Sequence, residues 1–165
     1  MKEISIYDFA LSGAFGPVKI GMTKDEIVEI IGCPDSDNDF KTGSSGLLYG
    51  WYEFFYWTDN KKLFAIQNDH LDSDTTDNFN YSNGLFRFDP WIFTRQIRLQ
   101  DLCDILVTDK IQFEIKSFND REIIELQTGF IFDFDNEIWS ESDNDWIKIP
   151  NYMDSKLIGF RYFKD

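Results

Sequence analysis

The chain has one histidine, His70, within residues 68–72, which read Asn-Asp-His-Leu-Asp. A single imidazole cannot supply the histidine pair common in zinc sites, and any nucleophilic triad would have to use this one base. The sequence has no Gly-x-Ser-x-Gly elbow to present a nucleophile beside it. We therefore expect His70 to be a hydrogen-bonded residue at a strand end rather than a catalytic base, and we expect no bound metal or cofactor.

Acidic loops offer a second set of ligands. Residues 35–39 read Asp-Ser-Asp-Asn-Asp, and alternate oxygen ligands of this kind begin an EF-hand calcium loop. The sixth position is Phe40 where the turn needs glycine, and the twelfth is Gly46 where a bidentate glutamate is required. Asp72 and Asp74 form a still looser pair. We interpret these acids as solvated loop charge, with weak calcium binding left open.

Other catalytic patterns are also missing. Thirty acidic residues would bring some carboxylates together in any fold, so a carboxylate pair is no evidence of glycoside hydrolysis. The Gly-Ser-Ser-Gly segment at residues 43–46 lacks the lysine of a phosphate-binding loop. Cys33 and Cys103 lie far apart without Cys-x-x-Cys spacing, which favours reduced structural thiols. The sequence predicts that the chain is not an enzyme.

The elements that must position any site begin with a helix at Thr23. Thr23 and Glu26 form a capping box, in which each side chain satisfies an amide left free at the helix start. Isoleucine and valine at helical spacing follow within residues 27–31, and Gly32 then Pro34 end the helix.

Strands follow this helix. Residues 47–57 are rich in aromatic side chains that favour strands, and a polar turn joins them to residues 63–67 as a hairpin. Asn83-Gly84, between two apolar runs, is the strongest two-residue hairpin signal in the chain. Further strands are predicted in the second half, at residues 123–134, 146–149 and 157–163.

The second half of the chain repeats the pattern of the first. Residues 26–31 align with residues 101–106, acid on acid and apolar on apolar, at six consecutive places, and the turn Asp59-Asn60 aligns with Asp135-Asn136. A tandem unit explains both matches. We expect an α+β fold, one αβ domain made of two similar units at about 1–88 and 89–165. Each unit would be a short helix followed by an antiparallel β-meander, with the helices on one face of the sheet.

Alternation along the predicted strands assigns their faces. In the second unit the residues expected to face the core are Ile124, Leu126, Phe130, Phe132 and Phe134, and those expected to face water are Glu125, Gln127 and Asp133. In the first unit the corresponding buried set is Leu48, Tyr52, Phe54 and Tyr56. The opposite face would then carry Tyr49, Trp51, Glu53, Phe55 and Trp57.

That opposite face should meet water, yet it is aromatic. Exposed aromatic side chains around one carboxylate are typical of a protein-binding surface, because tryptophan and tyrosine dominate interface energetics. The alternative is that a loop or the other unit covers this face. A β-bulge that shifted the register would exchange the two faces.

Charge limits the choice of partners. The chain has 16 Lys and Arg against 30 Asp and Glu, a net charge of −14 and a pI near 4.3. Such a field repels nucleic acid and anionic lipid and attracts cationic partners, although acidity alone could serve solubility. Residues 1–9 carry acids where a signal peptide needs a basic end and an apolar run. No segment approaches the ~18 apolar residues of a membrane span, so we expect a cytoplasmic protein.

Residues 16–34, Gly-Pro-Val-Lys-Ile-Gly-Met-Thr-Lys-Asp-Glu-Ile-Val-Glu-Ile-Ile-Gly-Cys-Pro, resemble a known motif in which Gly-Met-Thr opens a helix that closes with Leu-Gly-x-Pro. This motif belongs to the repeat of small outer-membrane assembly lipoproteins and of the beta-lactamase-inhibitor-protein fold, and related repeats occur in bacterial immunity proteins that neutralise secreted toxins. Ile31 stands where leucine is usual. The resemblance covers the first 70 residues. The second unit lacks the glycines and the proline, and the chain lacks the lipidation cysteine of the lipoproteins.

The resemblance and the charge together predict an immunity protein that binds and inhibits a cognate toxin, such as a basic nuclease. The aromatic residues would anchor the toxin, and acidic loops beside them would steer it. The expected partner-binding residues are Trp51, Glu53, Phe55, Trp57, Asp35, Asp37, Asp72 and Asp74. Two alternatives stay open: a small-ligand-binding or hydrolytic protein that uses the sheet concavity and His70, and a non-inhibitory assembly adaptor.

Overall fold

The computed structural model describes residues 1–71 and 76–164, and for residues 76 and 77 it describes the backbone alone. It is an α+β fold, as expected from the sequence. The helical elements of the described chain are α1 (Ile6–Ser12), α2 (Lys24–Ile31), α3 (Leu99–Thr108) and the 3₁₀ turns η1 (Thr76–Phe79) and η2 (Tyr152–Asp154).

Helix α2 has the ends that its sequence predicts. The Thr23 hydroxyl accepts a hydrogen bond from the Glu26 backbone N–H, and the Glu26 carboxylate accepts one from the Thr23 backbone N–H at 2.7 Å. Gly32, with φ +94°, ends the helix in a conformation that residues with a Cβ rarely adopt. Ile27 and Ile31 point into the core.

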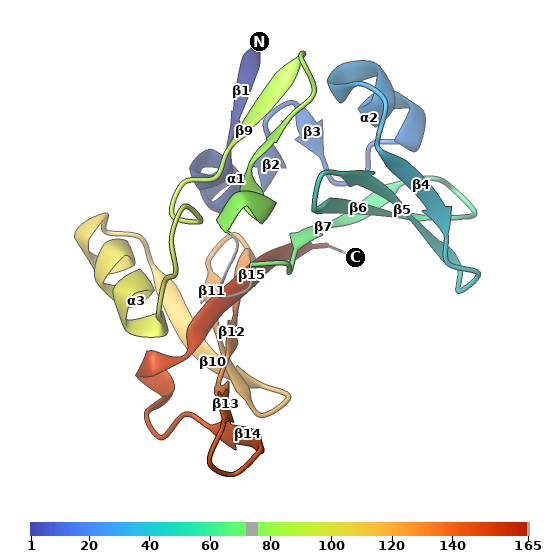
Figure 1. Cartoon of the computed structure of the whole chain (residues 1–165). Coiled ribbons are helices and arrows are strands. Elements are labelled where there is room, and N and C mark those ends of the chain that lie inside the picture. Colours follow the sequence, from blue (N-terminus) through green and yellow to red (C-terminus); the bar gives the residue numbers. More distant parts are fainter. Residues whose placement is uncertain (72–75, 165) are drawn as a thin grey trace.

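An eight-stranded antiparallel sheet organises the molecule (Figure 1). In spatial order its strands are β10 (Phe113–Phe118), β11 (Arg121–Leu126), β12 (Ile131–Asp135), β15 (Lys156–Phe163), β7 (Leu63–Asn68), β6 (Tyr52–Trp57), β5 (Ser44–Tyr49) and β4 (Ser36–Asp39). The sequence predictions missed β10. This edge strand is exposed along most of its length, so it lacks the alternation that marks a half-buried strand.

Smaller sheets complete the fold. They contain β1 (Lys2–Ser5), β9 (Phe86–Asp89) and β8 (Tyr81–Ser82), then β2 (Ala14–Phe15) with β3 (Val18–Lys19), and finally β13 (Glu137–Ser140) with β14 (Asp145–Lys148). The predicted hairpin at Asn83-Gly84 is confirmed, because Tyr81 pairs with Phe88 across it. Helix α1 and strand β1, which pairs in parallel with β9, were not foreseen from the sequence.

Each half of the large sheet is preceded in the chain by a helix. Helix α2 precedes the meander β4 to β7, helix α3 precedes β10, β11, β12 and β15, and the last strands of the two runs lie side by side at the sheet centre. In both runs, a residue just before the helix accepts a backbone hydrogen bond from the last strand of that run, β7 or β15. The Leu63 N–H donates to the Met22 carbonyl at 2.8 Å, and the Leu157 N–H donates to the Ile97 carbonyl at 2.8 Å.

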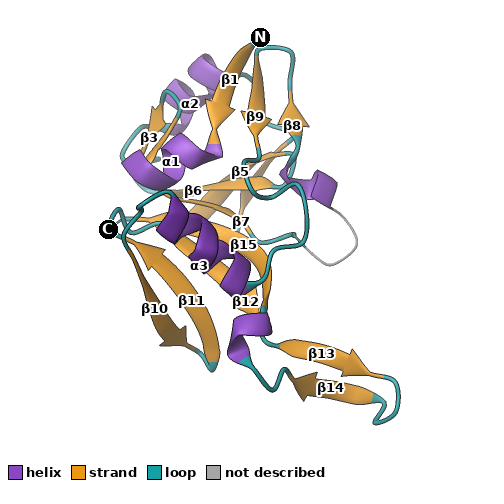
Figure 2. Cartoon of the chain, turned by 90° about the vertical axis from the view of Figure 1, so that its left-hand side faces the viewer, coloured by secondary structure: helices purple, strands orange, loops and turns teal. Residues whose placement is uncertain are grey.

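The two runs of strands differ most in the length of their last connection. A five-residue turn, residues 58–62, joins β6 to β7, whereas residues 136–155 join β12 to β15. The longer connection contains the β13–β14 hairpin, which projects from the end of the molecule (Figure 2). It also contains η2, which packs on α3.

The three α-helices lie on one side of the large sheet, and the core fills the space between them (Figures 1 and 2). Phe9 of α1 lies in this core, and its ring makes edge contacts with Phe15 of β2 and, from the second half of the sheet, with Phe130, Phe160 and Tyr162. The second-unit residues expected in the core, Ile124, Leu126, Phe130, Phe132 and Phe134, are all buried. No α-helix of the described residues lies on the opposite side of the sheet.

The predicted buried and exposed faces of the first unit are correct for the residues of β6 and wrong for those of β5. Tyr52, Phe54 and Tyr56 are buried as expected, but Tyr49 is fully buried and Leu48 faces outward, half-buried. The prediction treated residues 47–57 as one run. A two-residue turn at Gly50 and Trp51 instead reverses the chain, so Tyr49 pairs with Tyr52 on the same face.

Candidate functional site

The uncovered side of the sheet around β5, β6 and β7 is the candidate functional site, and we name it the open face. Residues directly opposite each other in an antiparallel pair point to the same face. Glu53 pairs with Leu48 and Gln67, so these three side chains share the open face. Phe55 pairs with Gly46 and Ala65, and these three residues continue the open face along β6.

Four aromatic side chains form the open-face cluster: Phe40, Phe55, Trp57 and Phe64. Trp57 and Phe64 stack with their ring centroids 4.1 Å apart, and the Phe55 ring lies 6.3 Å from Phe64 and 5.9 Å from Phe40. Phe40 and Trp57 each remain 42% exposed. Their apolar area is therefore packed within the cluster but not covered from outside.

Sequence reasoning found Phe55 and Trp57 but missed the two partners. A β-bulge opposite Phe55 and Tyr56 places Phe64 beside Trp57, and strict alternation cannot locate such a bulge. Phe40 follows the last residue of β4 and folds over Gly46, which has no side chain to exclude it. The sequence feature that could have identified Phe40 is that it is an aromatic residue in an otherwise polar segment.

Trp51 lies at the other end of β6, apart from the cluster. It occupies the β5–β6 turn, is 45% exposed, and its indole centroid lies 4.5 Å from the His70 imidazole at an interplanar angle of 50°. The four partner-binding residues expected on this face from the sequence thus form two patches. Phe55 and Trp57 belong to one, and Trp51 and Glu53 to the other.

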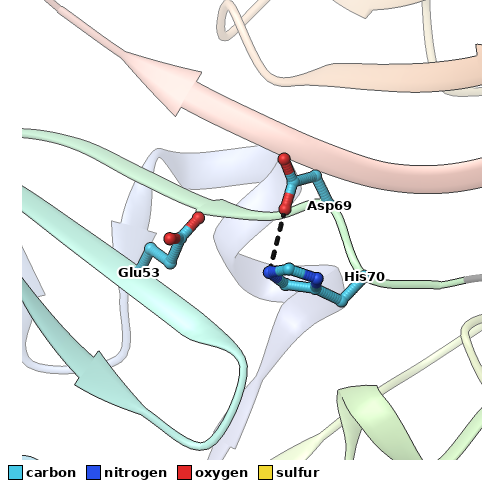
Figure 3. A group of neighbouring side chains, drawn as sticks. All are labelled: Glu53, Asp69 and His70. Carbon is cyan, nitrogen blue, oxygen red and sulfur yellow. Dashed lines mark ion pairs between the residues drawn. The ribbon is translucent and has the colours of Figure 1, made fainter. Parts of the chain in front are cut away.

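Glu53, Asp69 and His70 converge beside Trp51 (Figure 3). The His70 Nε2 atom lies 3.2 Å from Asp69 Oδ1, and one ligand atom from each of the three residues lies within 4.8 Å of the others. Gln67 donates a 2.7 Å hydrogen bond from Nε2 to Glu53 Oε2, which orients that carboxylate. The sequence indicated Glu53 and His70 separately but gave no sign that they meet.

Backbone contacts fix the position of His70, which lies just beyond the end of β7 as expected. Its N–H donates to Asn68 Oδ1 at 3.1 Å, and its carbonyl accepts from Asn78 Nδ2 at 2.6 Å. Asn68 is fully buried and Leu71 nearly so, and the Leu71 N–H donates to the Ile158 carbonyl at 2.9 Å. The imidazole therefore extends from a well-anchored segment and remains 40% exposed.

Asp37 was expected beside the aromatic anchors, and this placement is wrong. Asp37 pairs with Leu47, which is buried on the helix side, so its carboxylate points away from the open face. It accepts hydrogen bonds from Lys24 of α2 and from the Tyr56 hydroxyl. Asp35 accepts a 2.7 Å hydrogen bond from the Gly50 N–H and so braces the β5–β6 turn.

The ionisation of Asp37 reflects these contacts. Burial acts to raise the pKa of its carboxyl, but hydrogen bonds from Lys24 and Tyr56 outweigh it and hold the pKa below its usual range. The hydrogen bond from Lys24 in turn raises the pKa of that amine. Asp37 thus links α2 to the sheet. The other two predicted steering acids, Asp72 and Asp74, lie outside the described residues.

A second polar patch lies on the same side of the sheet, toward β12 and β15. Arg161 forms an ion pair with Asp133 at 3.1 Å, and its guanidinium lies 4.6 Å from the Phe118 ring centroid. Burial raises the pKa of the Asp133 carboxyl, an effect that Arg161 opposes. These residues, with Asp69 and Gln67, line a shallow depression between the two sheet halves.

The β13–β14 hairpin carries a further exposed aromatic pair. Trp139 and Trp146 face each other across it with ring centroids 5.7 Å apart and remain 48% and 58% exposed. Three acids lie at or beside its tip: Glu141, Asp143 and Asp145. Sequence reasoning predicted a strand here but did not select these residues, although tryptophans flanking an acidic turn were a readable signal.

Both cysteines carry free thiols, with Cys33 exposed and Cys103 buried. Burial raises the pKa of the Cys103 thiol, which makes it a poor nucleophile. Among the described residues, none of the helices has the length and apolar character needed to cross a bilayer.

Comparison with models of known protein families and with curated proteins finds no match. Among solved structures, an extracellular protein containing a SCP domain from Bacillus anthracis is similar with a TM-score of 0.36 and 10% identity. The alignment covers 88% of this chain and 44% of that protein. At this level the similarity carries no argument about fold family or function.

Proposed function

We propose that this chain is an inhibitory binding protein, an immunity protein that binds a cognate bacterial toxin through its open face in the cytoplasm of the producing cell. The observation that carries the proposal is the open-face cluster. Four aromatic rings pack against one another on the side of the sheet opposite the three α-helices, and two of them stay 42% exposed. Apolar surface gathered in this way is typical of an interface.

Charge supports a cationic partner. The net charge of −14 speeds association with a basic protein, and a basic nuclease is the toxin class that such an inhibitor fits. The β13–β14 hairpin supports the same proposal. It presents Trp139 and Trp146 with acids at its tip, a combination suited to an apolar pocket with a basic rim.

We also propose that residues of α2 to β7 and of α3 to β15 are two copies of one helix-and-meander unit. The matched hydrogen bonds at Leu63 and Leu157, described above, support this duplication. Two isolated β-bridges support it as well. Thr23, the N-cap of α2, pairs with Lys62, just before β7, and Arg98, the N-cap of α3, pairs with Lys156, the first residue of β15. In this proposal the β13–β14 hairpin is an insertion into the second copy.

The test is co-expression. The carboxy-terminal region of the protein encoded by the adjacent upstream gene is taken as the candidate toxin. It is expressed with and without this chain, and growth and co-purification are measured. Rescued growth with a stable complex supports immunity. Undiminished toxicity, with both proteins folded and soluble, overturns the proposal. A stable complex with a harmless partner would instead indicate an assembly adaptor.

A small-ligand-binding or hydrolytic function is the second candidate. It is favoured by Glu53, Asp69 and His70, which bring two carboxylates and an imidazole together on the surface. The variant His70→Ala separates the two candidates. It should leave toxin inhibition almost unchanged and should abolish a hydrolytic activity.

A further inference from the structure

We infer that Glu53, Asp69 and His70 form a surface site for a divalent transition metal, with Zn²⁺ as the best fit. Imidazole nitrogen and carboxylate oxygen are ordinary zinc ligands, and three protein ligands leave one position for water. The inference does not depend on the proposed toxin partner.

The geometry is already close to that of a metal site. Two ligands on one tetrahedral zinc, each about 2.0–2.1 Å from the ion, lie about 3.3 Å from each other. The His70 Nε2 and Asp69 Oδ1 atoms are 3.2 Å apart, and the Glu53 ligand atom completes a group whose members all lie within 4.8 Å. Small side-chain rotations would bring all three within coordinating distance, because Asp69 and His70 are 54% and 40% exposed.

The surroundings orient the ligands without competing for them. Gln67 holds one Glu53 oxygen, Asn68 and Asn78 fix the His70 backbone, and the Trp51 indole lies against the imidazole. The nearby cation Arg161 is paired with Asp133 rather than with Asp69. Outer contacts of this kind typically change metal affinity 10- to 100-fold.

Electrostatics also favours a cation here. Glu53 and Asp69 carry two negative charges side by side, and the whole chain carries −14. A divalent ion between the two carboxylates would relieve their repulsion, and the protein field would concentrate such ions at the surface.

The test titrates the full, metal-free chain with Zn²⁺ by calorimetry and with Co²⁺ by absorption and tryptophan fluorescence. We expect one strong equivalent of zinc, and binding that weakens on acidification because the ion competes with a proton for the imidazole. Bound Co²⁺ should quench Trp51. Trp51→Phe should remove most of that quenching while one equivalent of metal still binds.

Two variants locate the ion. His70→Ala should weaken zinc binding at least about tenfold, which corresponds to about 1.4 kcal/mol. Glu29→Gln, which removes one exposed acid from α2 on the helix side, should leave the affinity unchanged and controls for charge. Cys33→Ser controls for zinc held by the exposed thiol. Circular dichroism and unfolding verify that each variant is folded.

Three results would overturn the inference: no stoichiometric zinc binding by the native chain, equal affinity in folded His70→Ala, or loss of binding in Cys33→Ser. None of them bears on toxin inhibition. That activity is scored separately, with and without a chelator.

Discussion

Gly159 of β15 and Asn68 at the end of β7 approach so closely that a Cβ on Gly159 would lie 2.2 Å from the Asn68 carbonyl oxygen. Phe160, the next residue, pairs directly with Asn68 where the two halves of the large sheet meet. The chain at Asn68 and Asp69, where β7 ends, therefore packs so closely on residue 159 that only glycine fits there.

Gly159→Ala should destabilise the fold by about 1–3 kcal/mol or more, because the atoms that the new methyl group meets are backbone atoms with little freedom to move. Denaturant unfolding followed by tryptophan fluorescence measures the loss. Gly46→Ala is the matched control. Its Cβ would approach the half-exposed Phe40 ring closely and the Phe54 carbonyl oxygen only at an ordinary contact distance of 3.9 Å. Because the Phe40 ring can swing outward, a smaller loss is expected. Equal losses in the two variants would contradict the close approach at Gly159.

Asp37 should contribute to acid sensitivity. Its pKa in the folded protein is held below the unfolded value, so its contribution to stability is present above that value, near 3.9, and is lost as pH falls through the folded pKa. Asp37→Asn should lower the unfolding free energy at neutral pH by less than about 1 kcal/mol, because the Asp37 side chain is 39% exposed and solvent screens its ion pair. The variant should also lose less stability than the native chain as the pH is lowered. Tyr56→Phe removes one hydrogen bond to Asp37 and should act in the same direction. A stability profile for Asp37→Asn parallel to that of the native chain would exclude this role.

Trp57→Ala should weaken binding of the cognate toxin by about 2 kcal/mol or more, the loss typical of a central aromatic anchor. Surface plasmon resonance with the purified toxin measures it. Val107→Ala, at a 67% exposed position of α3 on the opposite side, should have no effect. Trp51→Ala tests the other patch of the open face. If folded Trp57→Ala and Trp51→Ala both bind normally, the partner does not use this face.

Association should slow as ionic strength rises, because the net charge of −14 steers a cationic partner over distances that salt screens. Stopped-flow mixing at a series of salt concentrations gives the association rate, while the dissociation rate should change much less. A flat dependence would mean that the acidic surface serves solubility rather than steering.

The hairpin tryptophans should matter to binding but not to folding. Trp139→Ala and Trp146→Ala should each change the unfolding free energy by no more than about 0.5 kcal/mol, since both side chains are about half exposed on a projecting element. Phe132→Ala, in the fully buried core, should cost about 3–5 kcal/mol. A loss of toxin affinity in the tryptophan variants would extend the interface to the hairpin, and unchanged affinity would confine it to the open face.

Where local chemistry was sufficient, the sequence predicted the structure. Thr23 and Glu26 cap α2, Asn83-Gly84 turns a hairpin, and the alternation around Phe132 identifies the buried face, because each pattern depends only on neighbouring residues. The α+β class follows from the same local signals. The net charge, which limits the partners, depends on composition alone.

Only the tertiary structure decided what the surface presents. The turn at Gly50 and Trp51 reversed the face of Tyr49, and a bulge moved Phe64 beside Trp57, because a single residue shifts every later side chain in a strand. Asp37, expected to face a partner, instead binds Tyr56 on the helix side. Glu53 and His70 come together only because β6 and β7 are neighbours in the sheet, and contacts between residues this far apart in the chain arise from strand pairing rather than from local sequence.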